Sequence, residues 1–247
     1  LYAQPLIDPE APSQMRSYEV LTRLRDKDGQ LIRPPEFLTL ASQAQMSVPL
    51  DRGVIRLAFE WLAANPEALA LTWKCSINLA GATMSDDTIA DFIREQRANN
   101  AIPAAKVVFE ITESEAIRNP AAASRLVDDL KAQGFGIALD DFGTGYSSLT
   151  YLHTLPFDEI KIDRSFIQGL PQQAVSRAIV NAILALANGL KLEAVAEGIE
   201  RPDEFACIQQ NLPDCTLQGN LFCPPLSAAD LRARLHTDTR FQPALPA

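Results

Sequence analysis

Short apolar segments alternate with amphipathic helical segments along most of this 247-residue chain, and this alternation constrains the fold more than any other feature. It is typical of parallel β-sheets in which helices connect successive strands. The expected strands are 2–7, 18–24, 73–79, 107–111, 136–139, 159–162, 194–196 and 218–222, and the expected helices are 51–64, 86–98, 121–133, 147–154, 173–190, 202–210 and 228–235. Eight strands in a chain of about 250 residues are typical of a (β/α)8 barrel.

The connection between the first two strands is too short for a helix. It spans residues 8–17 and includes Pro9 and Pro12, whereas a crossover between parallel strands needs about a dozen residues or more. We therefore expect an α/β fold, a TIM-like (β/α)8 barrel with an antiparallel first strand. The alternative is an open doubly wound sheet, but no G-x-G-x-x-G motif follows the first strands to support a dinucleotide-binding version.

No internal repeat or linker divides the chain, so we expect residues 1–247 to form a single domain with a frayed tail over 237–247. The chain begins at Leu1 rather than Met, which suggests a fragment of a longer protein whose other parts could be anchored to a membrane. The fragment itself has neither a signal peptide nor an apolar run of the roughly 18 residues that span a bilayer. We therefore expect no membrane contact from it.

Charge and cysteine content limit the partners and the compartment. The 31 acidic and 22 basic residues give a formal net charge of −9, which argues against a broad basic face for DNA or an anionic membrane. A small anionic ligand remains compatible if metal ions supply local positive charge. The four cysteines form no C-x-x-C pair, which excludes zinc ribbons and thioredoxin-like motifs and favours a reduced, cytoplasmic compartment.

Polar side chains stand where the expected strands end. The stretch GIALDDFGTG ends a buried strand on Asp140 and Asp141, two carboxylates that disfavour each other's ionisation unless a cation lies between them. Other strands carry comparable residues at or near their ends: Glu19, Arg23, Asn78, Glu110, Glu113, Lys161, Asp163, Glu197, Glu200 and Gln218. Because the strand ends of a barrel meet at one mouth, we expect an acidic ring around one lysine.

The residue types in this ring favour hard divalent cations. The only histidines are His153 and His236, so the sequence offers little support for a histidine-dependent catalytic triad. Oxygen ligands without His or Cys favour Mg²⁺ or Mn²⁺ over Zn²⁺. Four or five carboxylates exceed the needs of one ion, and adjacent Asp140 and Asp141 could share two ions about 3.5–4 Å apart. Such a site predicts hydrolysis of a phosphate ester.

Each signal has a simpler interpretation when it is taken alone. A single acid at a strand end is usually a solvated loop residue or a helix cap. Gly143 and Gly145 could form only a tight turn, and Lys161 could simply neutralise neighbouring acids. The DFG sequence at Asp141 also occurs in protein kinases as a magnesium motif, but no glycine-rich loop or H-R-D stretch accompanies it here, so we exclude a kinase.

Taken in order, the motifs resemble the EAL-domain family of cyclic di-GMP phosphodiesterases over nearly the whole chain. The E-A-L-x-R signature appears as EVLTR from Glu19, E-x-T-E as EITE from Glu110, and D-D-F-G-T-G is intact from Asp140. The segments SINLA, IKID and AEGIE supply the family's asparagine, its lysine and aspartate, and its two later glutamates. The resemblance runs from YAQPLID at Tyr2 to QGNLFCPPL at Gln218.

This resemblance implies a metal-dependent phosphodiesterase that converts cyclic di-GMP into linear pGpG with a water activated by two metal ions, Mg²⁺ or Mn²⁺. The implied ligands are Glu19, Asn78, Glu110 and Asp140 for one ion, and Asp140, Asp141 and Glu197 for the other. Ca²⁺ is expected to bind but to support turnover poorly, because its looser coordination shell relaxes the two-ion geometry.

The same resemblance implies roles for the remaining residues of the ring. Lys161 would orient or help to deprotonate the attacking water, and Glu200 and Gln218 would complete the catalytic group with Glu19. Arg23 and Asp163 would lie at the substrate, with Asp163 also supporting Lys161. Glu113 would bind no metal and would instead hold the 141–145 loop.

The family also implies partners and alternatives. Active members are commonly dimers, so we expect a homodimer, covalently linked to sensory or cyclase domains in a longer protein. The departures from the family pattern are Val20 in the signature, Ala41–Ser42 and Asn220, none of which is a metal ligand; they could alter dimer packing or the grip on substrate. The alternative functions are a catalytically silent cyclic di-GMP receptor, which typically lacks some of these acids, and a scaffold that ignores the nucleotide.

Overall fold

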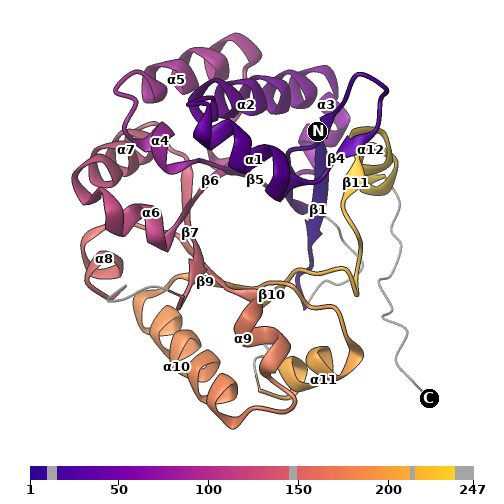
Figure 1. The fold of residues 1–247 in the computed structure, drawn as a ribbon, viewed down its shortest axis with the longest axis vertical. Helices are drawn as coiled ribbons and strands as arrows, with labels where there is room; N and C mark the ends of the chain where they lie inside the picture. Colours follow the sequence, from indigo (N-terminus) through magenta and orange to yellow (C-terminus); the bar gives the residue numbers. More distant parts are fainter. Residues whose placement is uncertain (10–15, 145–148, 212–214, 237–247) are drawn as a thin grey trace.

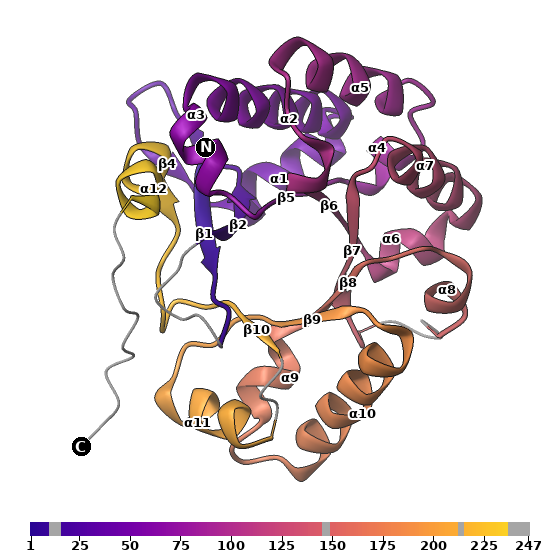
Figure 2. The ribbon, with the colours of Figure 1, turned by 180° about the vertical axis from the view of Figure 1, so that it is seen from behind.

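A curled sheet of nine strands forms the centre of the molecule in this computed structural model, which describes residues 1–9, 16–144, 149–211 and 215–236. Figures 1 and 2 show the strands around a central axis with the helices outside them. The strand order is β10-β9-β8-β7-β6-β5-β2-β1-β11. The strands are β1 (Tyr2–Leu6), β2 (Ser17–Leu21), β5 (Lys74–Asn78), β6 (Val107–Thr112), β7 (Gly136–Phe142), β8 (Glu159–Ile162), β9 (Glu193–Ala196), β10 (Thr216–Leu217) and β11 (Leu226–Ser227).

Helices connect most of the successive parallel strands and cover the outside of the sheet. They are α1 (Pro34–Gln43), α2 (Ser47–Ala64), α3 (Pro66–Leu71), α4 (Gly81–Met84), α5 (Ile89–Asn100), the 3-10 helix η1 (Ala104–Lys106), α6 (Glu113–Arg118), α7 (Pro120–Ala132), α8 (Leu149–Thr154), α9 (Arg164–Gly169), α10 (Ala174–Leu190), α11 (Pro202–Asn211) and α12 (Ala228–Leu235). None of the helices in the described part of the chain is both long and apolar enough to cross a bilayer.

The sheet closes into a barrel through its first strand. β1 pairs antiparallel with β2 and with β11, whereas β2 and β5 to β10 pair in parallel. Closure occurs at Ile7 and Leu217, whose backbone N–H groups donate to each other's carbonyl oxygens at 2.8 and 2.9 Å. The predicted TIM-like barrel with an antiparallel first strand is confirmed.

The two-residue period of the strands separates the hydrophobic core from the polar axis. In β6, Val107, Phe109 and Ile111 belong to the hydrophobic core, and the Phe109 ring packs edge-on against Phe135 with centroids 5.2 Å apart. Glu110, between two of these residues, points to the opposite face, because successive side chains of a strand alternate. Glu110 therefore lies on the inner face of the barrel.

The expected strand over 218–222 is wrong. β10 ends at Leu217, and the chain then turns, with the Ile199 N–H donating to the Gln218 carbonyl and the Leu221 N–H to the Ile199 carbonyl, both at 3.0 Å. Gly219 allows this approach, because a β-carbon there would lie 2.0 Å from the Ile199 carbonyl oxygen. Gln218 consequently follows the strand and stands at the barrel mouth instead of opening a strand.

The segment between the second strand and α2 is also more structured than expected. The strand expected over 18–24 stops at Leu21, and a separate hairpin of β3 (Leu24–Arg25) and β4 (Leu31–Ile32) leads into α1. The Arg33–Pro34–Pro35 sequence starts α1 with proline in its first turn, where no intrahelical N–H bond is lost. The frayed tail expected over 237–247 and the start of the helix expected over 147–154 lie outside the described residues.

Candidate active site

A single lysine stands at the centre of the acidic ring on the barrel axis. The Nζ atom of Lys161, in β8, lies 2.6 Å from Glu197 Oε1, 2.8 Å from Glu110 Oε2, 3.3 Å from Glu19 Oε2 and 3.6 Å from Asp140 Oδ1. Its side chain is 1% exposed. Segments that are far apart in the sequence thus bring four carboxylates to one ammonium group, as the strand-end pattern predicts.

Two amide side chains fix the carboxylate of Glu19. Asn78 Nδ2 donates to Glu19 Oε1 at 2.6 Å, and Gln218 Nε2 donates to Glu19 Oε2 at 2.7 Å. Gln218 Nε2 also lies 3.3 Å from Oε1 of Gln4, and Gln4 Nε2 donates to Asn220 at 3.3 Å. Glu19 is therefore held on both oxygens and cannot rotate without breaking a hydrogen bond.

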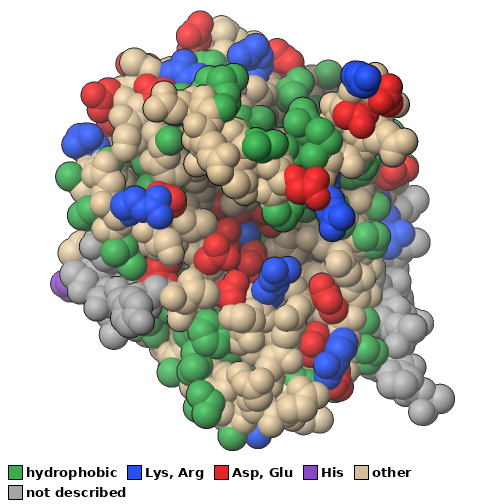
Figure 3. All heavy atoms as spheres, in the orientation of Figure 1, with side chains coloured by type: hydrophobic (Ala, Val, Ile, Leu, Met, Phe, Trp, Pro, Cys, Tyr) green, Lys and Arg blue, Asp and Glu red, His purple; other side chains and the backbone are tan. Residues whose placement is uncertain are grey.

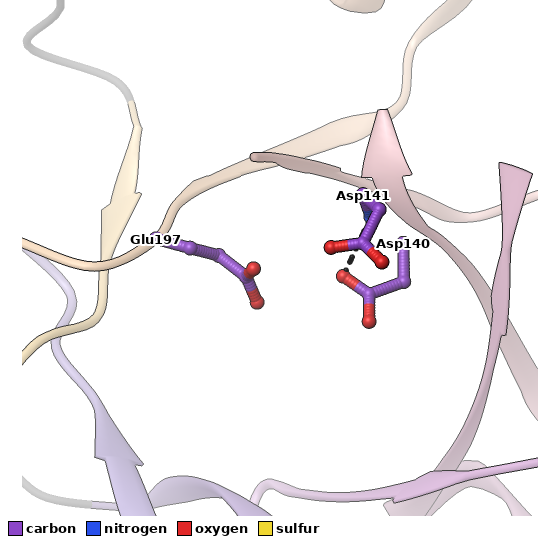
Figure 4. A group of neighbouring side chains, drawn as sticks. All are labelled: Asp140, Asp141 and Glu197. Carbon is purple, nitrogen blue, oxygen red and sulfur yellow. Dashed lines mark hydrogen bonds between the residues drawn. The ribbon is translucent and has the colours of Figure 1, made fainter. Parts of the chain in front are cut away.

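Asp140 and Asp141 face the same space although they are neighbours in a strand. Asp141 has a left-handed backbone, with φ of 54°, and the register between β7 and β8 shifts between Leu139 and Phe142. Such a bulge redirects a side chain that regular pleating would send to the opposite face. Figure 4 shows both carboxylates extending from the end of β7 toward Glu197, and one oxygen from each of the three residues lies within 4.8 Å of the others.

Burial and mutual repulsion make most of these carboxylates hard to ionise. Burial, followed by the charges of Asp140 and Asp163, raises the pKa of Asp141 to about 6. Burial raises the pKa of Glu197 to about 8 despite its ion pair with Lys161. The pKa of Glu110 is raised well above its usual range, again by burial first. One ammonium group therefore does not neutralise the ring.

Glu19 and Lys161 keep their charges. Burial raises the pKa of the Glu19 carboxyl, but the charge of Lys161 and the two amide donors outweigh it and lower the pKa overall. Burial lowers the pKa of Lys161, but Asp140, Glu110, Glu19 and Glu197 together raise it well above its usual value. The lysine is thus a permanent cation in this arrangement and acts as a hydrogen-bond donor.

The donor set fits divalent cations. Oε1 of Glu110 is buried and has no hydrogen-bond partner, and an orphaned carboxylate oxygen of this kind is costly unless something positive approaches it. Asp140, Asp141 and Glu197 offer three further converging oxygen atoms. Oxygen donors alone, with neither sulfur nor imidazole, suit Mg²⁺ and Mn²⁺.

Glu113 is separated from the ring and contacts the loop after β7. It is the first residue of α6 and is buried, and its Oε2 accepts the Gly143 N–H at 2.9 Å. Gly143 has a φ of 99° and lies against the Phe166 ring, which leaves little room for a side chain. Gly145, at the end of the predicted loop motif, lies outside the described residues.

An open pocket lies over the ring. It is lined by Gln4, Glu19, Asp140, Arg164, Glu197, Gly198, Glu200, Gln218, Gly219 and Asn220. Figure 3 shows the corresponding hollow near the centre of the face, with acidic side chains gathered in it and basic ones beside it. Glu200, implied by the resemblance, is thus at the pocket, and its N–H donates to Glu204 Oε2 at 2.9 Å.

Two residues that the resemblance implies at the substrate do not line this pocket. The Arg23 guanidinium stacks 5.6 Å from the Tyr2 ring centroid and donates to the Thr22 carbonyl at 2.9 Å, outside the pocket lining. Asp163 caps α9 by accepting the Ser165 N–H at 3.0 Å, and it influences the site through Asp141.

Sequence reasoning did not identify Gln4 or Arg164, which both line the pocket. Gln4 is a polar residue in an otherwise apolar first strand. Because side chains alternate along a strand and Ala3 lies in the core, Gln4 points to the barrel axis. The sequence pattern could therefore have identified Gln4. Arg164 directly follows the lysine and aspartate of IKID, but its exposed position at the start of α9 carries no such pattern.

Comparison with known proteins gives a consistent result. The EAL domain family matches residues 1–225. The cyclic di-GMP phosphodiesterase NbdA of Pseudomonas aeruginosa is 34% identical over 247 residues, which are 100% of this chain and 31% of that protein. The cyclic di-GMP phosphodiesterase PdeB of Shewanella oneidensis is 35% identical over 206 residues, 82% of this chain and 24% of that protein. The chain thus spans about a quarter to a third of the length of these relatives.

Solved structures agree with the sequence comparison. The PaMucR phosphodiesterase in complex with c-di-GMP has a TM-score of 0.86 and 34% identity, covering 94% of this chain and 93% of that one. The FimX EAL domain from Pseudomonas aeruginosa bound to c-di-GMP has a TM-score of 0.84 and 26% identity, covering 97% and 93%. The chain therefore belongs to the EAL domain family.

Proposed function

We propose that this domain hydrolyses one phosphodiester bond of cyclic di-GMP and releases linear pGpG. The observation that carries the proposal is the convergence of five carboxylates, from Glu19, Glu110, Asp140, Asp141 and Glu197, on the space around one buried lysine. Relatives that are named cyclic di-GMP phosphodiesterases and a phosphodiesterase structure in complex with c-di-GMP support this substrate.

We assign two divalent cations, Mg²⁺ or Mn²⁺, to this site. Glu19, Asn78, Glu110 and Asp140 would hold one, and Asp140, Asp141 and Glu197 the other. Such ions lower the pKa of bound water and neutralise the charge that develops on the phosphate. Ca²⁺ would occupy the site but inhibit, because it accepts more ligands at longer distances than Mg²⁺.

The protein's own groups position the reacting atoms. As a buried cation, Lys161 donates a hydrogen bond that orients the attacking water, because its raised pKa makes it a poor proton acceptor. Gln218 and Asn78 hold Glu19 in place. Glu200 lines the pocket and orders the water, and Glu113 holds the loop after β7 through Gly143.

A nucleotide assay tests the proposal. The purified chain is incubated with cyclic di-GMP and Mg²⁺ or Mn²⁺, the products are separated by chromatography, and the assay is repeated with a chelator. We expect metal-dependent formation of pGpG, which Glu19→Gln abolishes and the exposed-surface control Glu60→Gln does not. Nucleotide binding without turnover would indicate a receptor, and the absence of both would indicate a scaffold.

We further propose that the domain acts in the cytoplasm as a homodimer within a longer protein that contains sensory or cyclase domains. The limited share of its relatives that the chain spans supports this arrangement, as does its 35% identity to the bifunctional diguanylate cyclase/cyclic di-GMP phosphodiesterase MucR of Pseudomonas aeruginosa, over 94% of this chain and 34% of that protein. Light scattering coupled to size-exclusion chromatography, with and without nucleotide, tests the dimer; a monomer under both conditions contradicts it.

A further inference from the structure

Among the described residues that line the pocket, Arg164 is the one basic residue. The same lining contains four carboxylates, those of Glu19, Asp140, Glu197 and Glu200. Among the described residues, no ion pair shorter than 4 Å joins Arg164 to any of them, although arginines elsewhere in the chain pair readily with acids, as Arg201 does with Asp203. The guanidinium therefore remains available to a ligand at the edge of an acidic pocket.

The position of Arg164 is fixed by close contact with the end of β9. Gly198 has a φ of 67°, and a β-carbon at Gly198 would lie 2.4 Å from the Arg164 β-carbon and 3.4 Å from its α-carbon. The start of α9 and the residue after Glu197 are thus pressed together, which only glycine permits. The Arg164 side chain therefore leaves the backbone beside Gly198, which directly follows Glu197, one of the three converging acids.

The chemistry of the proposed substrate calls for a cation at this place. Cyclic di-GMP carries two phosphodiesters, and only one can lie at the cluster formed by Asp140, Asp141 and Glu197. The other brings a full negative charge into a pocket that is otherwise acidic, where like charges repel. A guanidinium presents a planar pair of N–H donors that matches two phosphate oxygens, unlike the point charge of a lysine.

We propose that Arg164 binds the non-reacting phosphodiester of the substrate and so favours cyclic dinucleotides over simple phosphodiesters. This proposal rests on the proposed function, since it concerns the same pocket. It adds Arg164 to Arg23, the arginine that the resemblance implies at the substrate and that stacks on Tyr2 in this structure.

Steady-state kinetics with two substrates test the assignment. Arg164→Gln, Arg164→Lys and the wild-type chain are compared on cyclic di-GMP and on bis(4-nitrophenyl) phosphate, which has a single phosphodiester. The control is Arg94→Gln, an exposed arginine of α5 that pairs with Asp91 at 2.7 Å. We expect Arg164→Gln to raise the KM for cyclic di-GMP about tenfold, as for the loss of one hydrogen bond to a charged group. The loss of kcat/KM should be smaller on bis(4-nitrophenyl) phosphate than on cyclic di-GMP. The KM of Arg164→Lys for cyclic di-GMP should lie between those of the wild type and Arg164→Gln. Arg94→Gln should have the same kinetic constants as the wild type.

Calorimetric titration with cyclic di-GMP, in Ca²⁺ to suppress turnover, measures the same contact without catalysis. Arg164→Gln should raise the Kd about tenfold. An unchanged KM and Kd for cyclic di-GMP, or equal losses on both substrates, would overturn the assignment. If the wild-type chain binds cyclic di-GMP without cleaving it, the proposed hydrolysis is contradicted. Weaker binding by Arg164→Gln would still support the contact between Arg164 and the phosphodiester.

Discussion

The Nζ atom of Lys161 lies 2.8 Å from Oε2 of Glu110, and neither side chain is more than 1% exposed. A buried ion pair is strongly destabilised when one partner is removed, because the other charge is left uncompensated. Here the lysine faces three further carboxylates, so it contributes both to folding and to the chemistry of the site. These two contributions can be separated by varying the lysine and the metal independently.

Replacement of Lys161 by methionine should impair stability and catalysis in different ways. Without metal, the free energy of unfolding should fall by about 3–5 kcal/mol, as for other broken buried pairs. Saturating Mg²⁺ should restore much of this loss, because the ions neutralise the same acids. Turnover of cyclic di-GMP should stay about a hundredfold low, because the hydrogen bond that positions the attacking water is lost. Urea unfolding with and without Mg²⁺, together with the chromatographic assay, measures both effects.

The matched control Lys27→Met alters an exposed lysine and should change neither the free energy of unfolding nor the turnover. Near-normal turnover in Lys161→Met would remove the lysine from the mechanism.

Replacement of Glu113 by alanine should affect the loop after β7 without removing a metal ligand. Its carboxylate accepts the Gly143 N–H at 2.9 Å, and loss of this partner leaves the amide unprotected. We expect faster hydrogen exchange at Gly143 and Thr144 and about a tenfold loss of turnover, equivalent to roughly 1.4 kcal/mol, within the range for a charge-assisted hydrogen bond. Glu113→Gln keeps an acceptor oxygen and should lie in between. Wild-type exchange together with a full rate in Glu113→Ala speaks against the assignment.

Asp51 supports the site from outside the barrel. It is a buried residue of α2 whose Oδ2 accepts the Ala80 N–H at 2.8 Å and the Thr83 hydroxyl at 2.5 Å, just after Asn78. Asp51→Ala leaves both donors without their partner and should lower the free energy of unfolding by about 1–3 kcal/mol. Because the loop that follows Asn78 loosens, the Mg²⁺ concentration needed for half-maximal rate should also rise. Asp51→Asn retains an acceptor and should be milder, whereas equal effects of the two variants would point to the charge alone.

The sequence was sufficient to predict the barrel and most of the ring because both follow from simple periodicities. Alternation within β6 and β8 sends Glu110 and Lys161 to the axis while their neighbours enter the core, and parallel strands bring their ends to one mouth. The short connection 8–17 correctly indicated an antiparallel first strand. These features depend only on local pattern and on the general geometry of barrels.

Other features depend on tertiary contacts that leave no local pattern. The end of β10 before Gln218 is set by backbone contacts of Gly219 with Ile199, which the local sequence QGNLF over 218–222 does not reveal. The bulge at Asp141 turns two adjacent carboxylates to one side. Likewise, the proximity of Arg164 to the pocket requires Gly198, a residue distant in sequence.

The metal-free domain should lose stability as pH rises, in a manner that Glu197 controls. The pKa of Glu197 is about 8 in the folded chain, above its ordinary value near 4.5, so the folded state holds a proton that the unfolded state releases. The free energy of unfolding therefore falls with a slope of up to about 1.4 kcal/mol per pH unit between roughly pH 4.5 and pH 8. Asp141, with a pKa of about 6, adds to the fall at the lower end.

Urea unfolding in chelator should show the wild type losing stability relative to Glu197→Gln over this window. Saturating Mg²⁺ should cancel the difference or reverse it, since the ions bind only the ionised acids. Parallel pH profiles of the two proteins in chelator would show that Glu197 does not hold this proton.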